Sequence, residues 1–160
     1  RAANVSVETV YAHFESKTAL LRRVIDSAVV GDDAEVPLAE RPDFLAIGRG
    51  SRRDRINAAA GVAAAVHSAT APFARLLQEA AATDTAMAAE LADARRRQRV
   101  DVRSALSLIL GRPPADVELD GINAILSPEV FLLLTETNGW SVALYREWIA
   151  DALDRLLSGT

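Results

Sequence analysis

Apolar side chains recur every three or four residues along most of the chain, the spacing that places them on one face of an α-helix. Strict alternation of apolar and polar residues, the pattern of a half-buried strand, is absent. The pattern therefore predicts an all-α protein. We expect helices over residues 7–14, 17–30, 53–69, 72–82, 84–110, 116–138 and 141–157.

Capping residues and proline set the predicted helix boundaries. Pro72 fits the first turn of a helix, so it predicts a break between helices 53–69 and 72–82. Ser127 followed by Pro128 predicts a second break inside the long pattern of residues 116–138. Glycines at the expected ends, where a left-handed residue commonly stops a helix, are Gly31, Gly111 and Gly139.

Residues 32–52 are rich in proline and glycine and carry no long helical pattern apart from a turn near residues 44–47. They predict a linker between two parts of unequal size. The first part comprises residues 1–31, and the second, residues 53–160, holds the long helices.

The composition narrows the possible chemistry. There are no cysteines, which excludes disulfides, thiolate metal sites and cysteine nucleophiles. Half of the residues are hydrophobic, enough for a core, but the longest apolar run, residues 58–66, is far short of the ~18 residues of a membrane span. His13 and His67 have no ligands at metal-binding spacing, and no serine lies in a nucleophile elbow. We therefore expect no metal, no cofactor, no membrane contact and no enzymatic activity.

The charge is unevenly distributed. The formal net charge is −4, which argues against a protein that binds nucleic acid over its whole surface. Residues 1–30 nevertheless hold more basic than acidic side chains, while the rest of the chain is acidic. The only lysine, Lys17, lies in this N-terminal part.

Residues 4–21, NVSVETVYAHFESKTALL, carry the most specific pattern in the chain. It resembles the second half of the DNA-binding helix-turn-helix of TetR-family transcriptional repressors. The matching positions are Val5, Ser6, Thr9, Val10, Tyr11, His13, Phe14, Ser16, Lys17, Leu20 and Leu21. The resemblance implies a recognition helix that enters the major groove of DNA, followed by a helix that begins after Ser16.

The resemblance also implies roles for individual side chains. Short hydroxyls near the start of a helix suit phosphate, and a planar or long side chain reaches the DNA backbone. By this resemblance, the phosphate or backbone contacts are Ser6, Thr9, Tyr11, His13 and Lys17. Val7 and Glu8 match the variable positions that read bases, and Glu8 is suited to accept from a cytosine amino group.

The family layout further implies a cytoplasmic homodimer bound to a palindromic operator and regulated by a small molecule. We expect that about forty residues precede Arg1 in such a protein, since only Arg1 to Ala3 match the end of the helix before the turn.

The C-terminal part also resembles the family, through residues 126–131, residues 139–141, Tyr145 and Trp148. In the family, the last two helices pair with their copies in a second subunit. The predicted interface residues are Tyr145, Trp148, Ile149, Ala152, Leu153 and Leu156. Packing inside one subunit is the alternative use of the same stripe.

The helices between residues 53 and 110 correspond to the family's ligand-binding core. The candidate pocket residues are His67, Phe73, Leu77, Met87, Leu91, Gln98 and Phe131, and ordinary core packing is the alternative for each. A largely apolar lining would favour a hydrophobic or aromatic effector. The run Arg95–Arg99 contains arginines that spread around a helix next to acidic residues, which predicts a solvated face rather than a second DNA site.

Two other classes of function remain open at this point. One is a helical protein that binds or sequesters a small molecule without contacting DNA. The other is an all-helical enzyme, for which the sequence offers no catalytic arrangement.

Overall fold

The computed structural model describes residues 16–31 and 36–158, and this part of the chain is all-helical, with no strand. The helices are α2 (Lys17–Val30), α3 (Pro42–Leu45), α4 (Arg52–Ala81), α5 (Thr85–Leu110), α6 (Asp116–Ile125), α7 (Pro128–Leu132) and α8 (Val142–Leu157). Two short 3₁₀ turns, η1 (Leu38–Glu40) and η2 (Ala46–Gly48), flank α3, and a π-helical stretch, η3 (Leu133–Thr137), continues α7.

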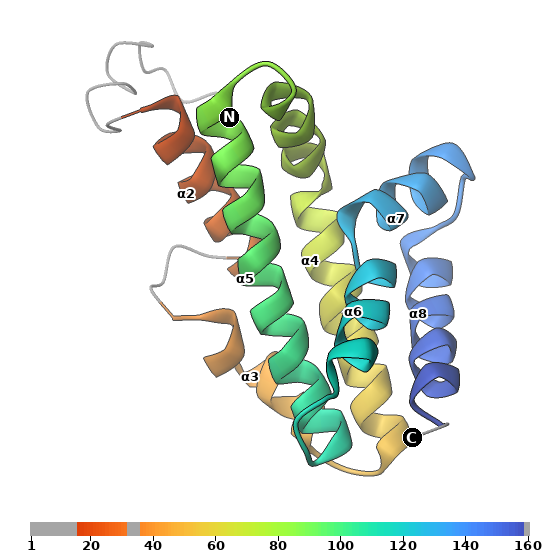
Figure 1. The fold of residues 1–160 in the computed structure, drawn as a ribbon. Coiled ribbons are helices and arrows are strands. Elements are labelled where there is room, and N and C mark those ends of the chain that lie inside the picture. Colours follow the sequence, from red (N-terminus) through yellow and green to blue (C-terminus); the bar gives the residue numbers. More distant parts are fainter. Residues whose placement is uncertain (1–15, 32–35, 159–160) are drawn as a thin grey trace.

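The long helices α4 and α5 run antiparallel and form the axis of the fold (Figure 1). On one side of this pair lie α6, α7 and α8, and on the other lie α2 and α3. Helix α4 occupies the central position, because it packs against α5, α8, α2, α7 and α3. The termini of α4 and α8 are tied together by an ion pair between Arg52 and Asp154.

The main core lies between α4 and its neighbours. At its centre are Tyr145, Ile149 and Leu153, spaced four residues apart on one face of α8 and almost completely buried. The other members of this core are Phe44, Ile47, Ile56, Ala59, Ala60, Ala64, Ala71, Val102, Leu106, Ile109, Leu119, Ile122, Phe131 and Leu157. Burial of these side chains supplies the main driving force for folding.

A second, smaller core attaches α2 to the rest of the protein. Leu21 of α2 is buried with Leu77 of α4 and Met87 of α5. Arg22 adds ion pairs with Glu90 at 3.5 Å and Asp93 at 3.7 Å, both on α5. Helix α2 is therefore fixed by both apolar and ionic contacts.

The capping residues act as the sequence predicts. Ser16 and Ser127 accept hydrogen bonds from the backbone of the first turns of α2 and α7, and Ser141 does so for α8. Gly31 and Gly111 end α2 and α5 with φ of 81° and 68°, a conformation that strongly favours glycine. The predicted helices 17–30, 84–110 and 141–157 are thereby confirmed to within one residue, and the break at Pro128 is confirmed too.

The break predicted at Pro72 is wrong, since α4 is one helix from Arg52 to Ala81. A proline inside a helix removes one backbone hydrogen bond and usually bends or ends the helix. Pro72 and Ser68, whose carbonyl loses its partner, are both exposed, so water reaches that carbonyl. Beyond the proline, Ala71 and Leu77 remain buried, and this packing retains the second half of the helix.

The described part of the segment predicted as a linker contributes side chains to the packed core. Phe44 and Ile47 are buried in the main core, and η1, α3 and η2 hold them there. The pattern near residues 44–47 indicated a turn but not its burial. The division of the chain into two domains stays a prediction.

Replacing Ile149 by Ala tests the central role of α8. Ile149 is fully buried, so Ile149→Ala should lower the free energy of unfolding by about 2–5 kcal/mol, through lost burial and a residual cavity. Val117→Ala is the control: Val117 is 87% exposed on α6, and its change should stay within about 0.5 kcal/mol. Urea unfolding of both variants measures the difference, and equal effects would contradict the burial of α8.

Candidate functional site

A cavity of about 610 Å³ lies between α2, α4 and α5. Helix α2 contributes one wall through Ile25, Val29 and Val30, and α4 contributes a second through residues such as Val62 and Val66. The wall from α5 contains Leu91, Ala94, Val102, Ala105, Leu106 and Ile109. Leu38, Phe44 and Ile47 line the part next to η1, α3 and η2. The volume and the apolar lining match those of sites that hold one drug-sized molecule.

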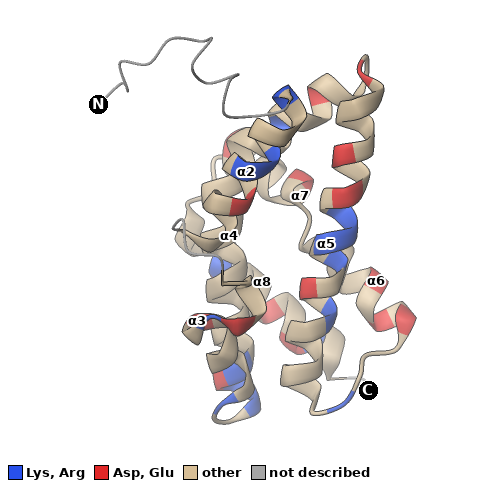
Figure 2. Ribbon diagram, turned by 90° about the vertical axis from the view of Figure 1, so that its left-hand side faces the viewer, with Lys and Arg blue, Asp and Glu red and all other residues tan. Residues whose placement is uncertain are grey.

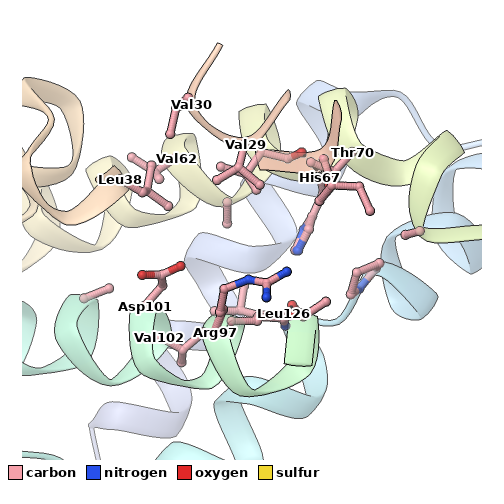
Figure 3. A pocket seen from close by; sticks show the side chains of 18 of the residues that line it. Val29, Val30, Leu38, Val62, His67, Thr70, Arg97, Asp101, Val102 and Leu126 are labelled. Atoms are coloured by element: carbon pink, nitrogen blue, oxygen red, sulfur yellow. Dashed lines mark hydrogen bonds between the residues drawn. The ribbon is translucent and has the colours of Figure 1, made fainter. Parts of the chain in front are cut away.

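Polar side chains project into this apolar space from two helices (Figure 3). His67 and Thr70 come from α4. From α5, Asp101 points across the cavity toward the wall of Val29, Val30 and Val62, and the guanidinium of Arg97 points along the cavity toward His67. A few polar groups on an apolar lining are what fixes the orientation of a bound molecule. The cavity is therefore chemically equipped for an amphiphilic ligand.

His67 joins the cavity to the core. Its Nδ1 lies 2.8 Å from the hydroxyl of Tyr145, and its ring also contacts that of Phe131. Burial lowers the pKa of His67 to about 4, although a backbone hydrogen bond with Leu126 and the charge of Glu129 act in the opposite direction. The imidazole ring of His67 is therefore neutral at physiological pH. Burial also raises the pKa of its partner Tyr145, so the tyrosine keeps its hydroxyl proton.

Gln98 and Thr70 have partners within the protein. The amide nitrogen of Gln98 donates to the carbonyl of Leu126 at 2.6 Å, which attaches α5 to the turn between α6 and α7. The hydroxyl of Thr70 donates to the Val66 carbonyl one turn earlier in α4, at 2.8 Å. These two side chains line the cavity, but each already donates a hydrogen bond to a backbone carbonyl of the protein.

The arginine run of α5 is neutralised by acidic residues. Figure 2 shows the basic segment of α5 next to acidic positions on the same helix and on α6. Arg95 pairs with Glu129, Arg96 with Asp93, Arg97 with Glu90, and Arg99 with Asp120. The expectation of a simple solvated face is corrected in one respect, because Arg95 and Arg97 line the cavity.

Asp101 differs from these arginines. Its carboxylate lines the cavity and makes no hydrogen bond or ion pair with any described residue. Burial raises the pKa of Asp101 above the usual range for a carboxyl group, and the charge of Arg97 offsets this only in part. Asp101 is thus a partly desolvated acid with unused acceptor capacity.

The structure brings together some of the pocket residues that the sequence predicts. His67, Leu77, Leu91 and Gln98 line the cavity. Phe73, Met87 and Phe131 do not: Phe131 belongs to the main core, and Met87 and Phe73 pack in the small core under α2. Large apolar residues fill a core more often than they border a void, and their sequence spacing does not distinguish the two uses.

Sequence reasoning missed Asp101 and the contribution of α2. A signal for Asp101 was present, because residues 91, 94, 98, 101 and 105 follow the helical spacing of the buried stripe. An acidic residue at one of these positions is expected to face the interior of the protein. The sequence gives no comparable signal for the wall that α2 contributes, because that wall exists only where α2 packs against α4 and α5.

The predicted DNA contacts Ser6, Val7, Glu8, Thr9, Tyr11 and His13 lie outside the described residues. Lys17 is described: it is the first residue of α2 and is exposed. Its role in DNA binding stays a prediction.

The predicted dimer interface needs a correction. Tyr145, Ile149 and Leu153 are buried within the subunit, so they are not available to a second copy. Trp148 and Ala152 are partly exposed, and Leu156 is about half exposed. These three side chains keep the prediction open.

In the described part of the chain, no group of three or more His, Asp or Glu side chains is placed to hold a metal ion. Among the helices of that same part, none combines the length and the apolar character that crossing a bilayer requires.

Comparisons of the chain with protein-family models, with curated proteins and with solved structures gave no match. Function is therefore inferred from residues 4–21 and from the geometry of the cavity.

The neutral His67 predicts a loss of stability in acid. Its pKa is about 4 in the folded protein and near 6.5 when unfolded, so the unfolded state binds the extra proton between these values. Stability is then complete above pH 6.5 and falls as the pH drops toward 4, by about 3 kcal/mol in total. Urea unfolding at pH 7 and pH 4.5 measures this loss.

His67→Gln is the matched variant, because it keeps a polar side chain without a group that titrates in this range. Between the two pH values, the free energy of unfolding should fall by about 2–3 kcal/mol less in the variant than in the wild type. Asp101 titrates in both proteins and cancels in the comparison. An equal loss in both proteins would contradict a buried neutral His67.

Proposed function

We propose that the chain functions as a ligand-responsive transcriptional repressor that resembles the TetR family and binds a palindromic operator as a homodimer. One observation carries the proposal. Residues 4–21 resemble the family's recognition helix and the start of the helix after it, and the last five of these residues form the first part of α2. Helix α2 is also a wall of the cavity. A site for a small molecule and a DNA-reading segment would then share one helix.

The contacts of α2 support such a coupling. Leu21 packs on Leu77 and Met87, and Arg22 pairs with Glu90, which also accepts from Arg97 at 2.8 Å. Arg97 lines the cavity, so a chain of ionic contacts connects the cavity to α2. A ligand that presses on the α2 wall would change the position of the preceding recognition helix and favour a state with lower operator affinity.

Dimerisation is part of the proposal. Helix α8 exposes Val142, Leu144 and Leu156, each more than 40% exposed, along with the partly exposed Trp148. Apolar side chains gathered on one helix often mark an interface between proteins. A second copy of this chain would cover them.

A second candidate function is a helical protein that binds or sequesters a small molecule without DNA. The volume and apolar lining of the cavity favour it as much as they favour a repressor. DNA binding separates the two candidates.

The first experiment is a DNA titration of the protein expressed from its full reading frame, against the intergenic DNA upstream of its gene and against random DNA. A repressor should bind the intergenic DNA at least about 10³-fold more tightly than random DNA, with a steep dependence on salt. The double substitution Tyr11→Ala with Lys17→Ala should weaken binding to all sequences and reduce the salt slope, by about 1 for the lysine.

Arg53→Ala is the control for lost positive charge. Arg53 is exposed at the start of α4 and far along the chain from the recognition segment, so its loss should leave operator affinity nearly unchanged. Binding no tighter than that to random DNA, in a protein that still binds small molecules, would favour the second candidate.

Filling the cavity should mimic a ligand. Ala63 lines the cavity from α4, and Ala63→Trp would occupy part of the space next to α2. We expect operator affinity to fall about 5- to 150-fold without any ligand, the usual range of allosteric coupling. Ala65→Trp, at an exposed position of the same helix, should have little effect. If both folded variants bind the operator like the wild type, the coupling through α2 is contradicted.

A further inference from the structure

The charges on the cavity wall are equal in number, but they are not all paired with one another. The cationic side chains that line it are Arg23, Arg95 and Arg97, and the acidic ones are Asp26, Asp101 and Glu129. Arg95 pairs with Glu129, and Arg97 pairs with Glu90 and lies 4.0 Å from Asp26. Arg23 is exposed, so water solvates its charge. Asp101 is left as the partly buried charge that makes no hydrogen bond or ion pair with a described residue, and the attraction of Arg97, which is already paired with Glu90, offsets its burial only in part.

The surroundings of Asp101 make its isolation costly. Its carboxylate points from α5 into the cavity, across from Val29, Val30 and Val62, which offer no donor (Figure 3). An ionised carboxylate removed from water is unfavourable unless it is paired or hydrogen-bonded. The neighbouring guanidinium of Arg97 points along the cavity toward His67, and its ion pair is with Glu90.

A ligand would supply what the protein does not. An ammonium or amidinium group on the ligand would pair with Asp101, and its hydrocarbon body would displace water from the valine, leucine and isoleucine side chains around it. A carboxylate ligand would instead meet the charge of Asp101 without finding a free buried cation. A neutral apolar ligand would leave Asp101 unpaired and remove its remaining water.

We propose that the cavity binds an organic cation, an apolar molecule with one protonated amine, whose charge pairs with the carboxylate of Asp101. This inference rests on the proposed function only in taking the cavity as a ligand site, and it names the chemical class of that ligand. Arg97 and Gln98, held by Glu90 and Leu126, border the site without competing for the amine.

The test uses three probes that share one apolar body and differ in head group: 4-phenylbutylamine, 4-phenylbutanol and 4-phenylbutyrate. Titration calorimetry at pH 7.5 with the full chain, without DNA, measures the affinity for each. The amine should bind at least tenfold more tightly than the alcohol, and the carboxylate should bind most weakly.

Asp101→Asn keeps the size of the side chain and removes its charge, so it should make the affinities for amine and alcohol equal. Asp101→Glu should retain a preference for the amine, because it retains the carboxylate. Glu79→Gln removes an equal charge from an exposed position of α4 outside the cavity, and should leave all three affinities unchanged. Thermal melting of each variant confirms that it is folded.

The inference is overturned if the alcohol binds as tightly as the amine, if the carboxylate binds best, if the amine does not bind, or if folded Asp101→Asn keeps the preference. None of these results depends on DNA. Failure to bind an operator would overturn the repressor proposal and leave the result for the amine intact.

Discussion

The structure depends on the central position of α4, which has to bury side chains in several directions at once. On one face, Ala60, Ala64 and Ala71 are small and buried, and His67 on the same face reaches Tyr145 of α8. Small side chains allow close approach of helices, so this face is densely packed. The cavity lies on the side of α4 toward α2 and α5, where residues such as Ala59, Val62, Ala63 and Val66 line it.

The position of Tyr145 follows from this arrangement. Its ring packs edge-on against Phe131 with centroids 4.9 Å apart, and its hydroxyl meets His67. A buried hydroxyl needs a partner, and the neutral imidazole supplies one at the boundary between the core and the cavity. The pair of His67 and Tyr145 therefore joins the core to the cavity.

Asp101, on the cavity side of α5, differs from the arginines of the same helix in having no ion-pair partner among the described residues. The arginines of the run 95–99 pair with acidic residues on α5, α6 and α7, which fixes the neighbouring helices and leaves little free positive charge. Asp101, one turn beyond Arg97, has no such partner. The proposed organic cation would complete the pattern of paired charges.

The sequence predicted much of the fold because local chemistry controls it. Ser127 and Pro128 start α7, Gly111 ends α5, and the apolar stripe of α8 is buried as its spacing indicates. The sequence failed where distant contacts decide the outcome. Pro72 lies inside a helix that tertiary packing holds together.

The candidate site was less predictable for the same reason. Phe131 and Leu77 have similar sequence patterns, yet only Leu77 borders the cavity. The wall from α2 exists because Leu21 docks on Leu77 and Met87, a contact between residues far apart in the chain. No local pattern around Val29 and Val30 encodes that contact.

We propose that the cavity is a ligand site and that its occupancy changes DNA binding through α2. The most direct measurement is the operator affinity of the full protein with and without saturating 4-phenylbutylamine, in the wild type and in Asp101→Asn. The amine should weaken operator affinity at least about fivefold in the wild type and have no effect in the variant. An amine that binds the chain but leaves operator affinity unchanged would contradict it.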